Sequence, residues 1–153
     1  MKRLFIYYSY TGNGDVAANF LKEKGVEIRK VIRRKSLPKS FFWSVMTGGF
    51  LAGIHHKDKL TGFDAMIKKY DEIIIGSPIW NARISSPINM VLRMLENGCL
   101  KEKKVSFVFY AGSGEGKKAL KRVNKRYNNP KVIFLKEPKK YPEELEKLNE
   151  LLK

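Results

Sequence analysis

The sequence contains a single cysteine, Cys99, among its 153 residues. One cysteine cannot form a disulfide within the chain, which excludes a disulfide-stapled scaffold and favours a reducing compartment. Long apolar runs are also missing, since the most apolar stretch, residues 41–54, is too short to cross a bilayer. The basic start of the chain has no long apolar segment or cleavage site behind it. We therefore expect a cytoplasmic protein without a transmembrane segment.

Acidic residues are scarce relative to basic ones. The chain has 31 Lys and Arg against 15 Asp and Glu, a formal net charge of +16. A positive field of that size attracts anionic partners, such as an acidic redox protein, a nucleic acid or an anionic membrane surface. A solvated, lysine-rich surface without a specific partner accounts for the same charge, because net charge governs solubility and association rather than fold.

Residue patterns for nucleophilic or metal-dependent catalysis are absent as well. His55 and His56 are adjacent, so on a helix they would point about 100° apart and would not form a metal-binding pair. Cys99 has no base partner visible in the sequence, and no serine lies in a G-x-S-x-G motif. We expect no catalytic side chain and no metal site.

Strand and helix patterns alternate along the chain. Apolar or β-branched runs predict five strands, at about residues 2–9, 26–32, 72–76, 105–110 and 132–135. Helical spacing of apolar residues predicts helices at about 14–24, 86–96 and 116–127, and another that starts at Pro142. The alternation predicts one α/β domain over residues 1–153, with an open, doubly wound parallel sheet.

The stretch from Ser36 to Tyr70 is longer than a simple helical crossover requires. It contains the apolar residues 41–54, which we expect to form a helix packed on the sheet and extended by a loop. The alternative is a segment that lies on a membrane surface, because basic residues within 33–39 flank its aromatic side chains.

The loop Ser9–Gly14 (SYTGNG) falls between the first strand and the first helix. It brings hydroxyls, an amide side chain and glycines to a helix N-terminus, where free N–H groups and the helix dipole favour a phosphate. The loop lacks the lysine of a nucleoside-triphosphate loop. This composition favours a phosphate held by neutral hydrogen bonds, as on a small cofactor.

Two further loops follow predicted strands. Residues 76–82 (GSPIWNA) contain Trp80, and residues 111–116 (AGSGEG) are rich in glycine. In a doubly wound sheet these loops meet the first at the carboxyl edge, where ligands bind. There the Trp80 indole could stack on a flat heteroaromatic ring, or it could pack on loop residues as a structural tryptophan.

Together these motifs resemble the flavodoxin family. The residues that carry the resemblance are SYTGNG (9–14), YDEIIIGSPIWNARISSPINMVL (70–92) and FYAGSGEG (109–116), and it extends over essentially the whole chain. It implies a flavodoxin-like five-stranded sheet of order 2-1-3-4-5, with helices on both faces and non-covalently bound FMN. The implied cofactor-binding residues are Ser9, Tyr10, Thr11, Gly12, Asn13 and Gly14 in the phosphate loop, Pro78, Ile79, Trp80, Asn81 and Ala82 at the isoalloxazine, and Gly112, Ser113 and Gly114 at its other side.

The chain departs from the family pattern at the site. Gly14 stands where the family usually has threonine, so one hydroxyl donor is missing, and Asp15 would repel a phosphate if it faced the site. The third loop lacks the tyrosine that often covers the flavin in electron carriers, because Tyr110 lies in the preceding strand. One face of the flavin is therefore expected to be open, as in flavodoxin-like reductases and quinone-reducing enzymes.

The function predicted from this resemblance is electron transfer, from a cytoplasmic donor to an acidic redox protein or a small electron acceptor. The alternative is an FMN-dependent NAD(P)H- or quinone-type oxidoreductase with an open flavin face. A second alternative is a non-enzymatic, basic binding module that has lost the flavin. Nucleic acid is disfavoured as a partner, because aromatic residues are not interleaved with the basic clusters. We expect a monomer or a weak homodimer.

Overall fold

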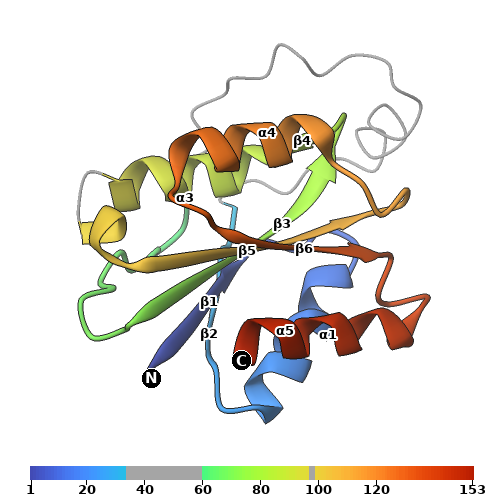
Figure 1. Ribbon diagram of the computed structural model, residues 1–153, viewed down its shortest axis with the longest axis horizontal. Coiled ribbons are helices and arrows are strands. Elements are labelled where there is room, and N and C mark those ends of the chain that lie inside the picture. Colours follow the sequence, from blue (N-terminus) through green and yellow to red (C-terminus); the bar gives the residue numbers. More distant parts are fainter. Residues whose placement is uncertain (34–59, 97–98) are drawn as a thin grey trace.

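The computed structural model describes residues 1–33, 60–96 and 99–153. Five parallel strands form a sheet of order β2-β1-β3-β5-β6, and helices cover both of its faces (Figure 1). The elements are β1 (Arg3–Tyr7), α1 (Asn13–Glu23), β2 (Glu27–Lys30), β3 (Glu72–Trp80), β4 (Arg83–Ile84), α3 (Ser86–Glu96), the 3₁₀ helix η1 (Cys99–Glu102), β5 (Lys104–Ala111), α4 (Lys117–Arg126), β6 (Lys131–Lys136), the 3₁₀ helix η2 (Pro142–Leu148) and α5 (Asn149–Leu152). The short strand β4 lies off the main path, so the predicted order of the parallel strands is confirmed.

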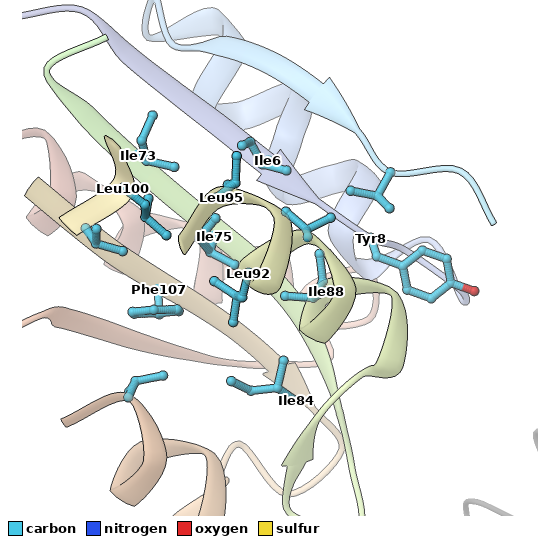
Figure 2. Packing of buried hydrophobic residues seen from close by; sticks show 14 of the residues in the cluster. Ile6, Tyr8, Ile73, Ile75, Ile84, Ile88, Leu92, Leu95, Leu100 and Phe107 are labelled. Carbon is cyan, nitrogen blue, oxygen red and sulfur yellow. The ribbon is translucent and has the colours of Figure 1, made fainter. Parts of the chain in front are cut away.

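Successive residues of the central strands are buried on opposite faces of the sheet. Ile6 and Ile75 join the cluster on the α3–α4 face, which Figure 2 shows from close by. Phe5 and Ile74 join the cluster on the α1–α5 face. Burial on both faces explains why these strands are apolar at nearly every position rather than at every second one.

Strand β3 is longer than the sequence suggested. It does not end at Gly76 but continues to Trp80, turns at Asn81 and Ala82, and returns antiparallel as β4. Pro78 lacks a backbone N–H, and the structure shows why the strand tolerates this. Alternate residues of a strand form hydrogen bonds with the same neighbouring strand, and Gly76 accepts one from Tyr8, just after β1. Pro78 therefore faces the same side, where β1 has already ended and no partner requires its N–H. The predicted loop at residues 76–82 is therefore a β-hairpin.

The segment after Pro142 also differs from the prediction. It is a 3₁₀ helix, η2, followed by the single α-helical turn of α5, rather than one α-helix. Its apolar residues Leu145, Leu148 and Leu151 are three apart, which is the period of a 3₁₀ helix. Leu148 and Leu151 are fully buried against the sheet, so this spacing lets the segment cover the core.

Some predictions concern residues outside the described ranges. These are the helix or membrane-surface segment at residues 41–54, the pair His55 and His56, and the helix stop at residues 97–98. Among the residues that the structure describes, no helix is long and apolar enough to cross a membrane.

A buried carboxylate joins three strands at their amino ends. Glu72 is fully buried, and its Oε2 lies 2.9 Å from Arg3 Nε and 3.4 Å from Lys104 Nζ. Its Oε1 accepts a hydrogen bond of 2.7 Å from Ser106 Oγ. Glu72 thus links β1, β3 and β5 at the amino ends of these strands, the edge of the sheet opposite to their carboxyl ends.

Replacing Glu72 by glutamine should lower the free energy of unfolding by about 2 kcal/mol, because Arg3 and Lys104 would lose the carboxylate that compensates their partial burial. Urea denaturation measures this loss. The matched change Glu23→Gln, at an exposed position of α1, should leave the denaturation midpoint unchanged. Equal midpoints for both variants would show that the Glu72 ion pairs contribute nothing to stability.

Candidate functional site

A cavity of about 440 Å³ lies at the carboxyl edge of the sheet. Its volume lies within the usual range for small-molecule and cofactor sites. The lining residues come from the loop after β1 and the start of α1, from the end of β3, from the end of β5 and the residue after it, and from the segment that follows β6: Thr11, Asn13, Pro78, Ile79, Trp80, Tyr110, Ala111, Gly112, Glu137, Lys139 and Lys140. Six of the predicted site residues therefore meet at one cavity.

The predicted phosphate loop leads directly into α1. Gly12 precedes the helix with a left-handed φ of 94°, a conformation that favours glycine, and it has no side chain to cap the first turn. Ser9 Oγ accepts a hydrogen bond of 3.2 Å from the Gly14 N–H. Thr11 and Asn13 line the cavity and are joined by a 3.1 Å hydrogen bond from Asn13 Nδ2 to Thr11 Oγ1. The loop thus brings a hydroxyl and an amide side chain to the cavity at a helix N-terminus.

The structure explains why residue 14 is glycine. A Cβ at this position would lie 2.6 Å from Tyr110 Oη and 2.9 Å from Tyr7 Cδ2. The Tyr110 side chain is buried, and its hydroxyl donates a hydrogen bond to the Tyr8 carbonyl. Tyr110 therefore lies beneath the phosphate loop, and its hydroxyl occupies the space that a side chain at position 14 would need.

The Asp15 carboxylate accepts hydrogen bonds from two residues that do not line the cavity. Its Oδ1 accepts hydrogen bonds of 2.9 Å from the Tyr7 hydroxyl and 2.6 Å from Lys30 Nζ. Partial burial acts to raise the pKa of Asp15, but the hydrogen bonds from Lys30 and Tyr7 outweigh it and lower the pKa overall. Lys30 neutralises the carboxylate, so the repulsion of a phosphate that the sequence suggested is reduced.

Trp80 both packs on its neighbours and lines the cavity. Its ring is edge-on to Tyr8 and Tyr10, at centroid distances of 6.1 and 6.3 Å. Pro78 and Ile79 continue the same wall of the cavity. The two roles considered for Trp80, structural support and an apolar wall, are thus compatible, and Tyr10 supports Trp80 rather than lining the cavity itself.

The remaining predicted residues shape the surrounding turns. Asn81 and Ala82, with φ of 48° and 60°, form the β3–β4 turn, and the Ala82 carbonyl accepts a 2.9 Å hydrogen bond from Ala119 N of α4. In the third loop Ser113 Oγ accepts a 3.3 Å hydrogen bond from Glu115 N. Gly114 donates from its N–H to the Ala111 carbonyl at 3.1 Å, which closes the turn beside Gly112.

One contribution to the cavity was missed by the sequence analysis. Glu137, Lys139 and Lys140 follow β6 and bring charged side chains to the cavity beside Thr11 and Asn13. The available signal was topological, because every loop at the carboxyl edge of such a sheet can reach a ligand. The loop after the fifth parallel strand carries no recognisable motif and was not considered.

The residues present fit a small cofactor in which a phosphate is joined to a flat ring. Hydroxyl and amide donors, a helix N-terminus and two lysines lie at one part of the cavity. The half-buried Trp80 and the apolar Pro78 and Ile79 form another part. A polar anchor with an apolar wall is the usual composition of a cofactor site.

Comparison with known proteins gives a family match over most of the chain. The model of the NADPH-dependent FMN reductase family matches residues 12–140. A flavoprotein from Lactobacillus acidophilus solved in complex with FMN is 23% identical over 86% of this chain and 89% of its own, with a TM-score of 0.60. A protein from Bacteroides eggerthii, assigned as a flavoprotein, is 20% identical over 86% of this chain and 84% of its own, with a TM-score of 0.67. These structures support the fold, and no curated protein matched the sequence.

Proposed function

Because the chain belongs to the NADPH-dependent FMN reductase family, we propose that it is an oxidoreductase that takes electrons from NADPH and passes them to a small acceptor. FMN is the cofactor, as the sequence motifs predicted. Bound FMN supplies the hydride and single-electron chemistry, while the protein supplies binding, orientation and electrostatics.

Each part of the cavity has a role in this proposal. Thr11, Asn13 and the N-terminus of α1 would hold the phosphate through hydrogen bonds. Trp80 and Ile79 would lie against the ring and keep water from it. The carboxylate of Asp15, paired with Lys30, remains outside this set.

The composition of the third loop favours a reductase over a dedicated electron carrier. Residues 112–116 are Gly, Ser, Gly, Glu and Gly, so no aromatic side chain of this loop can cover the cavity. The small residues leave room for a nicotinamide and then a small acceptor to approach in turn. The lack of an aromatic side chain in residues 112–116 is the observation on which the choice of a small acceptor rests.

The test is the reduction of the purified, FMN-loaded protein by NADPH under anaerobic conditions. We expect the visible flavin absorption to bleach with NADPH and to return when a small quinone is added. Bleaching by dithionite but not by NADPH would contradict the proposal and favour a carrier reduced by another protein. A colourless protein that FMN does not bind would contradict the assignment of the cofactor as well.

Replacing Trp80 by leucine should weaken FMN binding about tenfold, because the lost indole contact contributes about 1 kcal/mol or slightly more. Isothermal titration calorimetry with FMN measures this change. The matched change Trp43→Phe leaves Trp80 as the single tryptophan of the chain, and FMN should still quench its fluorescence. Unchanged affinity of the Trp80→Leu variant would show that Trp80 is only a packing residue.

A further inference from the structure

We propose that Lys139 is the ionic partner of the cofactor phosphate and thereby determines selectivity for FMN over riboflavin. The inference rests on the proposed function, and it concerns a residue that lies far along the chain from the phosphate loop. It changes the sequence-based expectation that neutral hydrogen bonds alone hold the phosphate.

Lys139 lies directly against the start of α1. Its backbone N–H donates a 3.1 Å hydrogen bond to Asn13 Oδ1. Its side chain passes over Gly12, since a Cβ built on Gly12 would lie 3.3 Å from Lys139 Cδ and 3.5 Å from Lys139 Nζ. The ammonium group is therefore beside the loop whose residues Thr11 and Asn13 line the cavity.

The backbone around Lys139 forms a hydrogen-bonded turn. Glu137 has a φ of 38°, and its carbonyl accepts hydrogen bonds from Lys140 N at 2.7 Å and from Tyr141 N at 3.0 Å. Pro138, which lies between Glu137 and Lys139, is buried. The backbone of Lys139 is thus fixed at the cavity by this turn and by the hydrogen bond to Asn13, while its side chain is exposed.

The positive charges beside Gly12 favour an anion, and they stand in a cavity that the carboxylate of Glu137 also lines. The N-terminus of α1 carries the positive end of the helix dipole, and the Lys139 ammonium adds a like charge beside it. None of the ion pairs among the described residues includes Lys139. Lys140 differs, because its Nζ lies 5.2 Å from the centre of the Tyr141 ring. A phosphate at the loop would satisfy both the helix N-terminus and Lys139.

Gly14 supplies a reason for this arrangement. Because Tyr110 excludes a side chain at position 14, the loop cannot offer a hydroxyl from that residue. A charge-assisted hydrogen bond from Lys139 would be stronger than the neutral one that is missing. The Lys139 ammonium group comes from the loop after β6, so a distant part of the chain supplies the donor that the phosphate loop lacks.

The experiment compares FMN with riboflavin, which lacks the phosphate, by calorimetric titration of the apoprotein. Lys139→Gln should raise the dissociation constant of FMN about tenfold and leave that of riboflavin within twofold. Lys139→Arg should restore most of the FMN affinity. The control Lys121→Gln removes the same charge from an exposed position of α4 and should change neither constant. Added salt should weaken FMN binding more in the wild-type protein than in Lys139→Gln.

The outcomes separate this inference from the proposed function. Unchanged FMN affinity of Lys139→Gln, or equal losses for FMN and riboflavin, would overturn the role of Lys139 while the FMN assignment stands. A wild-type protein that binds neither compound would overturn the proposed function itself. Equal losses of FMN affinity in Lys139→Gln and Lys121→Gln would indicate an effect of net charge and would also overturn the specific role.

Discussion

Replacing Gly76 by alanine should lower the free energy of unfolding by about 3 kcal/mol, a large effect for a single methyl group. The new Cβ would lie 2.5 Å from Phe5 Cζ and 2.8 Å from Tyr7 Cβ. Phe5 and Tyr7 are buried and stacked on each other, with ring centroids 5.2 Å apart and planes 3° from parallel. Neither side chain can move without disturbing the α1–α5 face of the core, so the clash becomes strain.

Guanidinium denaturation measures this effect, and two variants control for it. Gly112→Ala adds the same methyl group where no atom lies within 4 Å and should retain wild-type stability. Phe5→Leu combined with Gly76→Ala should be less destabilised than the sum of the two single variants, because the smaller side chain relieves the contact. A loss below about 1 kcal/mol for Gly76→Ala would mean that Phe5 moves aside easily.

Replacing Gly14 by threonine, the residue common in related phosphate loops, should impair this protein. The added side chain would collide with Tyr110 Oη at 2.6 Å and Tyr7 Cδ2 at 2.9 Å. We expect a loss of about 2 kcal/mol in the free energy of unfolding and a more than tenfold loss in FMN affinity, because both Tyr110 and the loop border the cavity. Denaturation and calorimetric titration measure the two losses.

Tyr110→Phe in the Gly14→Thr background tests the cause. This second change removes the hydroxyl that makes the closest contact, so part of the lost stability should return, although Tyr110 Cζ would still lie 2.9 Å from the new Cβ. Tighter FMN binding by Gly14→Thr would be the opposite result. It would show that glycine at this position is simply a missing donor.

The sequence was sufficient to predict the parallel sheet and two of the loops at its carboxyl edge, those after β1 and β5. Runs such as residues 73–75 are apolar at every position, which is typical of a strand covered on both faces. The β3–β4 hairpin was not predictable by the same rules, because Gly76 and Pro78 normally end a strand. Gly76 is there to make room for Phe5 of β1, and a contact between residues so far apart leaves no local pattern.

In the candidate site, too, residues in local motifs could be predicted, whereas residues placed by long-range contacts could not. Thr11, Trp80 and Gly112 lie in recognisable motifs, and all three line the cavity. Lys139 lies in a basic segment that resembles many others in a chain with 31 Lys and Arg. Only the position of its loop beside Gly12 distinguishes it. Likewise, the sequence shows Gly14 only as a missing hydroxyl donor, whereas the structure shows that Tyr110 leaves no room for a side chain there.

The buried Glu72 also has a consequence for how this protein can diverge. Its partners Arg3, Lys104 and Ser106 lie at the amino ends of the strands, whereas the cavity is at the carboxyl ends. Substitutions in the cavity loops therefore leave this ionic link intact, and effects of well-separated sites add independently. Such a chain can acquire a new acceptor preference by drift in its loops while selection for folding acts on the opposite edge.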